Sequence, residues 1–377
     1  MNMEYKRLGD IATYVNGYAF KPSDWSDAGL PIIRIQDLTG TSYQTNKYNG
    51  NYYSKYEIKN GEVLISWSAS LGVYVWSGTT ALLNQHIFKV VFDKVEVDKD
   101  FFVHQVASVL RKATSEVHGA TMKHLTKPVF DALPFYLPSI EKQKEISAVL
   151  NNIVGIINNR KQQLQQLDEL VKARFVEMFG DPTDIRLSRV PLIEYVENTK
   201  YGTSQPPKFD ENGCFKFIRA TNIKSGHINE KDMLFISKEE SEKIGKCKLN
   251  GGEIIIVRSG ANTGDTCVIT DEYKGQYAGY DIIVTLKTDK LNPVFLNELI
   301  NIPQYMKTVV KPLTARSAQP HLNTQQVQSL PILVVDIDKQ NEFAAFVEQV
   351  DKSKVAVQKA LNEAQTLFDS LMQEYFG

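Results

Sequence analysis

The chain has 377 residues, of which 42% are apolar and 23% are charged, and its formal net charge at pH 7 is −1. These values fit a globular protein of two or three domains, and the net charge gives no support for nucleic-acid binding through bulk charge. No apolar run reaches the length of a membrane span and the N-terminus lacks the apolar core of a signal peptide, so we expect a cytoplasmic protein without a membrane segment.

A strand-rich head is predicted for residues 1–138. It opens with a short helical segment at residues 8–15, and residues 101–113 near its end also have helical spacing. Between them, runs of β-branched and aromatic residues are separated by Gly, Asn and Ser, at residues 30–35, 62–67, 73–76 and 87–92. The pattern predicts an α+β head with an antiparallel or barrel-like sheet.

A long helix is predicted for residues 139–180. From Ile146 to Met178, apolar residues recur at alternating steps of four and three, and only Arg160 and Arg174 interrupt them. This is a heptad pattern with one apolar stripe. The sequence Gly-Asp-Pro at residues 180–182 then ends the helix and begins a linker.

The second half of the chain repeats the first. A second head is predicted for residues 181–335 and a second long helix for residues 336–377. The heptad stripe returns 197 residues later, from Phe343 to Tyr375, with Lys354 as its only interruption. Insertions between the copies lie inside the heads, where loops tolerate them, and none lies in the helices. The chain is therefore interpreted as a tandem duplication.

Each apolar stripe needs a partner, because it cannot face water along its whole length. The simplest partner is the other long helix, since both stripes have the same period. Two paired helices of about 40 residues would form a rod about 60 Å long that holds the two heads apart.

No catalytic constellation stands above background. The sequence has no Gly-rich methyltransferase loop, no DPPY- or NPPY-like tetrapeptide and no GxxxxGK[ST] motif. The six histidines have no metal-ligand spacing, and the three cysteines all lie in the second repeat, which argues against a disulfide framework or a close-spaced zinc site. We expect no catalysis and no metal in this chain, and a nuclease with an unrecognised acid pair is kept as an alternative.

Polar, aromatic and basic residues occur in Gly-rich loops at matching places in both repeats. Arg suits guanine, Asn and Gln suit adenine, and all of these side chains can contact phosphates. The segment between Glu298 and Asp336 contains no acid, which favours a basic surface there. The predicted DNA-binding residues are Lys21, Arg34, Gln36, Trp67, Ser70, Lys123, Thr203, Lys208, Arg219, Thr221, Asn222, Arg258, Asn262 and Arg316.

Each of these residues also has a structural interpretation as a strand-end, capping or solvated group. Trp67 and Trp76 are more typical of a core than of a stacking platform. His124 and His321, each followed by Leu, are interpreted as anchors of the junction between head and helix. The arginines within the first stripe are expected to extend their charged ends into water.

Several short motifs recur in the same order in both repeats. Each head ends in Leu-Pro, at Leu133 and Leu330, and each helix begins with Glu/Asp-Lys-Gln and closes with Phe-Gly. Residues 60–65 (NGEVLI) and 119–125 (GATMKHL) match the same pattern. Over essentially its whole length, the chain resembles the specificity subunit of type I restriction–modification systems.

The resemblance implies two target-recognition domains separated by an antiparallel pair of long helices. Each domain would read one half of a bipartite site in double-stranded DNA, and the helices would set the unread gap. The helices would also dock two modification (methyltransferase) subunits, with restriction subunits added outside. Catalysis with S-adenosylmethionine, ATP and Mg²⁺ would belong to those partners, and this chain would bind no cofactor. The second copy departs from the first at residues 315–320.

Partner docking is predicted on the outward faces of the helices, with Gln143, Lys161, Gln340 and Lys359 as the candidate residues. The alternative function is a coiled-coil-spaced adaptor with two protein-binding heads and no DNA specificity.

Overall fold

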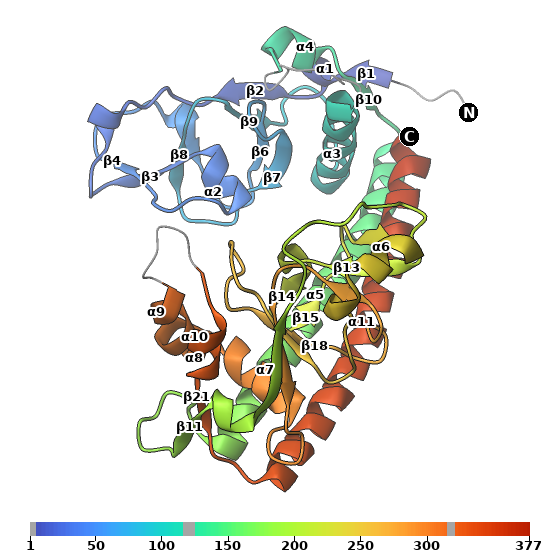
Figure 1. Ribbon diagram of the computed structural model, residues 1–377. Coiled ribbons are helices and arrows are strands. Elements are labelled where there is room, and N and C mark those ends of the chain that lie inside the picture. The colour runs from blue at the N-terminus through green and yellow to red at the C-terminus, as the bar shows by residue number, and fades with distance from the viewer. Residues whose placement is uncertain (1–4, 116–124, 315–320) are drawn as a thin grey trace. The chain divides into compact units, whose positions relative to one another are not determined.

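The structure is a computed structural model that describes residues 5–115, 125–314 and 321–377. The chain divides into two compact units. Unit 1 comprises Met1–Lys161 with Lys359–Gly377, and unit 2 comprises Gln162–Gln358. Each unit holds one head together with one part of each long helix (Figure 1).

The head of unit 1 alternates short strands with short helices. Its elements in chain order are β1 (Tyr5–Arg7), α1 (Leu8–Ile11), β2 (Thr13–Asn16), β3 (Leu30–Ile33), α2 (Ile35–Thr39), β4 (Lys47–Tyr48), β5 (Glu57–Ile58), β6 (Val63–Ser66), β7 (Gly72–Val75), β8 (Ala81–Leu83), β9 (Ile87–Val91), α3 (Lys99–Ser115), α4 (Lys127–Asp131) and β10 (Pro134–Tyr136).

Two small four-stranded sheets form the centre of this head. The first has the order β2-β9-β6-β7 and is antiparallel throughout. The second has the order β4-β3-β8-β5, in which β3 and β8 are parallel. Helix α3 lies against β7 and β10 (Figure 1). Its buried Phe101 and Phe102 join Phe88 of the first sheet and Ile146 of the long helix in one apolar core.

The head of unit 2 has a matching series of elements. They are β11 (Arg189–Pro191), β12 (Val196–Tyr201), β13 (Phe215–Ile218), β14 (Ile223–Lys224), β15 (His227–Ile228), β16 (Leu234–Ile236), α6 (Lys238–Lys243), β17 (Ile254–Ile256), β18 (Thr266–Val268), β19 (Tyr277–Ala278), β20 (Ile282–Leu286), α7 (Pro293–Asn301), α8 (Pro303–Tyr305), α9 (Lys311–Thr314), α10 (Thr324–Gln328) and β21 (Pro331–Leu333).

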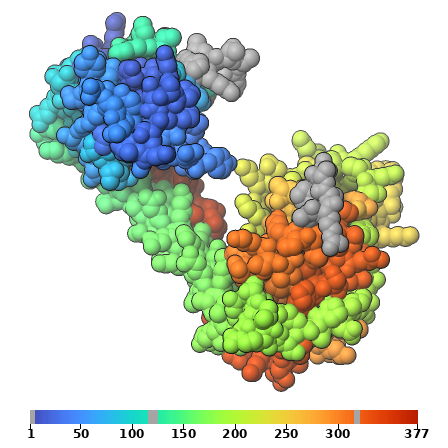
Figure 2. All heavy atoms as spheres, turned by 90° about the vertical axis from the view of Figure 1, so that its left-hand side faces the viewer, coloured from blue at the N-terminus to red at the C-terminus, as the bar shows by residue number. Residues whose placement is uncertain are grey.

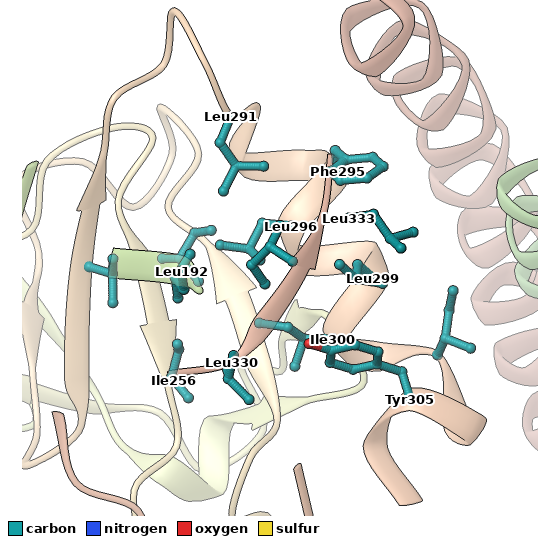
Figure 3. Packing of buried hydrophobic residues seen from close by; sticks show 14 of the residues in the cluster. Leu192, Ile256, Leu291, Phe295, Leu296, Leu299, Ile300, Tyr305, Leu330 and Leu333 are labelled. Atoms are coloured by element: carbon teal, nitrogen blue, oxygen red, sulfur yellow. The ribbon is translucent and has the colours of Figure 1, made fainter. Parts of the chain in front are cut away.

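The main sheet of unit 2 has the order β12-β20-β17-β18, which is the topology of the first sheet in unit 1. In the second sheet, β13 pairs in parallel with β19, as β3 does with β8. Figure 3 shows how Phe295, Leu296, Leu299 and Ile300 of α7 pack with Leu330 and other core residues. The internal repeat predicted from the sequence is therefore a repeat of the fold.

The two long helices are α5 (Ile140–Phe179) and α11 (Ile337–Phe376). In unit 2 they run antiparallel, because Arg174 pairs with Glu342 at 3.1 Å while Asp168 pairs with Lys354 at 2.8 Å. The predicted apolar stripes are buried at their head-proximal parts, and the charged interruptions Arg174 and Lys354 form ion pairs between the helices. In unit 1, Ile146 and Leu150 of α5 share a core with Met372 and Phe376 of α11.

One detail of the predicted elements changes. The helical segment expected at residues 8–15 is only α1, because β2 begins at Thr13 and pairs with β9. Of the two expected sheet types, the antiparallel one is present in the main sheet of each head, and the strands of the described residues do not close into a barrel. Within the described residues, no helix is both long and apolar enough to cross a membrane.

Candidate nucleic-acid interface

Arg258 lies at the centre of an exposed aromatic cluster in unit 2. It follows β17, and its guanidinium carbon lies 4.2 Å from the ring centroid of Tyr280 and 5.3 Å from that of Tyr201. The two tyrosine rings lie 5.6 Å apart, and the side chains are 46% and 36% exposed. We call Tyr201, Arg258, Tyr280 and His321 the Arg258 cluster.

Backbone and side-chain contacts fix this cluster. The Arg258 N–H donates to Asp281 Oδ1 at 2.9 Å, and the Arg258 carbonyl accepts from Leu322 N at 2.8 Å. Burial raises the pKa of the Asp281 carboxyl to about 6, although the contacts with Arg258 oppose this shift. Arg258 Nη2 also lies 3.3 Å from His321 Nε2, so His321 supports the turn that carries Arg258.

The cluster adjoins the acid-free segment noted in the sequence. Thr324 at the start of α10 donates its hydroxyl to the Tyr201 oxygen at 2.6 Å. Lys311 of α9 donates to the carbonyl of Thr263, in the turn after Arg258, at 3.1 Å. Helices α8 and α9 belong to the orange part of unit 2 in Figure 2. Lys307, between these two helices, and Lys311, in α9, are both exposed. Positive side chains without nearby acids on the same segment favour contact with phosphates.

In unit 1, the predicted residue Trp67 follows β6. Its ring stacks on Phe88 at 5.7 Å and meets His86 edge-on at 4.8 Å. Its indole N–H donates to Asn16 Oδ1 at 3.2 Å. Trp67 thus packs partly in the core, as its structural interpretation predicts. Its indole N–H also takes part in a polar contact at the surface. We call Asn16, Trp67 and His86 the Trp67 cluster.

Arg34 and Arg219 occupy equivalent turns after β3 and β13. The Arg34 guanidinium lies 4.6 Å above the ring of Trp25, and the backbone N–H of Arg34 donates to Asp37 Oδ2. The Arg219 N–H donates to Asn222 Oδ1, and its Nη2 donates to the Asp232 carbonyl at 2.5 Å. Both arginines are half-buried, as Arg258 is, and both are held by contacts within their own heads.

Two predicted amides act inside the head of unit 2. Asn222 is buried and donates to the carbonyls of Asn229 and Lys231. Asn262 donates to the carbonyls of Ala220 and Ile223, which joins two loops. Their DNA contact stays a prediction, but the hydrogen bonds assign both side chains a structural role.

The remaining predicted DNA-binding residues lie on loops, except Gln36 in α2 and Thr221 in the short helical turn Ala220–Asn222. The structure exposes Lys21, Gln36, Ser70, Lys208 and Thr221, while Thr203 is half-buried and donates to the Gln205 carbonyl. Lys123 and Arg316 lie outside the described residues. The candidates therefore do not form one continuous set, and the two clusters are the places where several functional side chains meet.

The docking prediction is wrong for the two glutamines, which do not lie on outward faces. Gln143 and Gln340 are each 1% exposed. Gln143 Oε1 accepts from the Asp98 N–H at 2.9 Å, and Gln340 Oε1 accepts from the Asn292 N–H at 2.9 Å. Each glutamine therefore anchors the first turn of a head helix to a long helix. Lys161 and Lys359 are exposed, as expected.

Tyr201, Tyr280, Asn16 and His86 were missed by the sequence analysis. Tyr201 and Asn16 immediately precede Gly202 and Gly17, and this shared Asn/Tyr-Gly strand end was the available signal. No signal links Tyr201 to Tyr280, because they are distant in sequence and meet only in the folded sheet. Among the described residues, no three His, Cys, Asp or Glu side chains are grouped to hold a metal ion.

Comparison with known families finds one domain twice in the chain. The model of the type I restriction modification DNA specificity domain matches residues 1–169 and 192–365. The specificity subunit of the type I restriction enzyme EcoBI of Escherichia coli is 23% identical over 397 residues, covering 97% of this chain and 83% of that protein. The MjaVIII specificity subunit of Methanocaldococcus jannaschii is 20% identical over 396 residues, covering 97% and 91%.

Solved structures share the fold over the whole chain. The S subunit of a type I restriction–modification system from M. genitalium gives a TM-score of 0.61 at 13% identity, covering 100% of this chain and 97% of that one. A chain from a study of assembly and conformational transition of the type I R-M system gives 0.55 at 14% identity, covering 100% and 98%. The predicted fold of two repeated α+β domains and paired long helices is thus confirmed. Because the family model covers both repeats, the chain belongs to the type I restriction modification DNA specificity domain family.

Proposed function

We propose that this chain is the DNA specificity subunit of a type I restriction–modification enzyme. The observation that carries the proposal is the recurrence of one family domain, with one sheet topology, in both heads. Each head reads one half of a bipartite site, and the long helices set the number of unread base pairs between the halves. Two similar readers with different loops suit an asymmetric site.

The chain works with two modification subunits, and restriction subunits join the complex outside them. The helices offer exposed apolar side chains for this purpose. In unit 1 these include Val149 and Ile156, which are one heptad apart on α5, and in unit 2 they include Leu170 and Val176. Exposed apolar residues on the same helix as the exposed Lys161 are typical of a protein–protein interface.

The chain itself is not catalytic in this proposal. S-adenosylmethionine, ATP and Mg²⁺ are used by the partner subunits, and the complex acts on DNA in the cytoplasm. The absence of a methyltransferase cofactor loop and of a GxxxxGK[ST] motif supports this division of labour.

The partners also supply part of the DNA affinity. With a net charge of −1, the chain neutralises few phosphates, and phosphate contacts dominate DNA affinity. We expect the isolated chain to bind its site more weakly than the full complex at the same salt concentration. Equal affinities would contradict this part of the proposal.

The test is the methylation pattern in cells. The chain is expressed with its modification subunit, and modified adenines are mapped across the host genome by single-molecule sequencing. We expect a split motif with a fixed gap, and none when the modification subunit is expressed alone. If the two proteins co-purify but produce no motif, the proposal fails and the adaptor alternative gains support.

A further inference from the structure

We propose that one end of the main sheet is the base-reading position in both heads, where Arg258 contacts a guanine in one half-site and Asn16 an adenine in the other. This inference rests on the proposed function and goes beyond it by assigning the reading residues. It is carried by the equivalence of the Trp67 and Arg258 clusters.

Three positions of the two clusters coincide in the repeated fold. Asn16 and Tyr201 end β2 and β12, where they pair with Phe88 and Ile282 near the start of β9 and β20. Trp67 directly follows β6, and Arg258 is the second residue after β17. Their carbonyls accept equivalent hydrogen bonds, from Leu125 N at 3.0 Å and Leu322 N at 2.8 Å.

The third position lies in the connection between the two sheets. His86 lies directly before β9 and contacts Trp67. Tyr280 lies two residues before the first residue of β20 and contacts Arg258. The three positions therefore meet at the same end of the same sheet in each head.

The backbone under these side chains is the same in both heads. A Cβ at Gly17 would lie 2.0 Å from the Asn84 carbonyl oxygen, and one at Gly202 would lie 1.7 Å from that of Gly279. Both glycines are thus required by the same close approach of two strands. The scaffold repeats while the side chains change from Asn, Trp and His to Tyr, Arg and Tyr, which is the expected pattern for two readers of different sequences.

The Arg258 guanidinium is held in an orientation that suits a pair of hydrogen-bond acceptors in one plane. Two tyrosine rings and His321 restrict its guanidinium, so less rotational freedom is lost on binding. Within the described part of the chain, Arg258 Nη1 and Nε have no hydrogen-bond partner. Guanine O6 and N7 form the acceptor pair in the major groove that arginine binds with two hydrogen bonds.

Asn16 is prepared differently. It is exposed, and the Trp67 indole N–H holds its Oδ1 at 3.2 Å. Its Nδ2 has no partner among the described residues, and Oδ1 keeps a second lone pair. An orientated amide with one free donor and one free acceptor matches adenine N7 and N6.

Phosphate contacts would lie beside the Arg258 cluster. Lys311 and Thr324, from the acid-free segment, are bonded to the Thr263 turn and to Tyr201. A base-reading arginine bordered by a positive segment is the usual arrangement of groove and backbone contacts.

The experiment compares methylation motifs of the complete complex carrying Arg258→Gln or Asn16→Ala. We expect Arg258→Gln to relax a G·C position in one half-site, with a fall of about 5- to 150-fold in discrimination at that base pair. Asn16→Ala should relax an A·T position in the other half-site, and the gap should not change. Arg186→Gln is the matched control, because this exposed arginine pairs with Asp184 away from the cluster.

Thermal unfolding and co-purification with the modification subunit establish that the variants are folded, and Arg258→Lys provides a milder second change. An unchanged motif overturns the inference, as does relaxation of the same half-site by both variants. Uniformly weaker binding to all sequences also overturns it, because it identifies Arg258 as a phosphate contact. A wild-type complex that yields no split motif would instead refute the proposed function.

Discussion

The two heads differ most in the helical layer beside the main sheet. In unit 1 this layer is one continuous helix, α3, whereas unit 2 divides it into α7, α8, a π-helical turn at Met306–Val310 and α9. Pro303 begins α8 and Pro312 lies in α9, and proline lacks the N–H that a continuous helix requires. The first turn is nevertheless the same, because Gln143 and Gln340 bind it in both units. Both heads therefore keep the glutamine that binds the first turn of the helical layer, while the rest of that layer differs.

The polar contacts between the next turns of these helices and the long helices also differ between the two units. Counted from the capping residues Asp98 and Asn292, His104 of α3 is equivalent to Glu298 of α7. His104 Nε2 lies 2.7 Å from Asn151 Oδ1 on α5. Glu298 instead lies near Lys354, Asp351 and Asp168 of the long helices, and burial raises its pKa to about 7. Unit 2 thus has a charged junction, formed by Glu298 with Lys354, Asp351 and Asp168, where unit 1 has a histidine–asparagine contact.

The largest effect is expected at the anchors. Gln340→Leu removes the partners of the Asn292 N–H and of the Lys290 and Val335 carbonyls, and should cost unit 2 about 3 kcal/mol of unfolding free energy. Gln143→Leu removes two such partners and should cost unit 1 about 2 kcal/mol.

The two units can be followed separately. All three tryptophans lie in unit 1, so tryptophan fluorescence during urea unfolding reports on that unit. Hydrogen exchange of peptides from unit 2 reports on the other. Gln349→Leu on the exposed face of α11 is the control, with an expected change below about 0.5 kcal/mol. Equal losses of unfolding free energy in the control and in the two anchor variants would show that the buried glutamines stabilise the units no more than an exposed glutamine does.

The next effect concerns pH. Because the folded-state pKa of Glu298 is raised from 4.5 to about 7, the folded state binds the proton more tightly. Unit 2 should therefore lose stability as the pH rises from about 4.5 through 7. Glu298→Gln should remove this loss and stabilise unit 2 by about 1–3 kcal/mol at pH 8, with little change at pH 4.

Hydrogen exchange of unit 2 at several pH values measures this effect. Glu239→Gln, at a side chain 80% exposed on α6, should leave the pH profile unchanged. If the stability of unit 2 depended on pH in the same way in the wild type and in Glu298→Gln, Glu298 would not be the source of the pH dependence.

A third change makes the helices of unit 2 resemble those of unit 1. Val154 and Ile157 occupy the positions equivalent to Asp351 and Lys354. Lys354→Ile alone should cost about 1–2 kcal/mol, because it leaves Asp351 Oδ1 buried without its cation. Adding Asp351→Val should recover most of this loss, and a double-mutant cycle measures the coupling. Additive losses would show that the two residues act independently.

The smallest effect on stability is expected at the exposed lysines. Lys359 lies 4.0 Å from Glu363, and both side chains are largely exposed, so Lys359→Glu should change the unfolding free energy by less than about 0.5 kcal/mol. The same change, combined with Lys161→Glu, should weaken co-purification with the modification subunit. Unchanged co-purification would place the docking surface elsewhere.

The features predicted correctly are those with a local pattern. Heptad spacing identified the long helices, β-branched runs identified strands such as β6 and β9, and the repeat identified the paired heads. The clusters were predicted only in part, since Tyr201 and Tyr280 meet through strand pairing that no local pattern encodes. The buried glutamines were misassigned because a polar residue on a helix is usually exposed, and here each satisfies a helix cap from another segment.

The strand pairs at the base of the heads have a further consequence. In unit 1 β1 pairs with β10, and in unit 2 β11 pairs with β21, so each head begins and ends at neighbouring strands. A segment whose entry and exit points adjoin can be replaced without rerouting the rest of the chain. Each head is thus a cassette, and recombination at these strand pairs would exchange one half of a target site while the helices stay as they are.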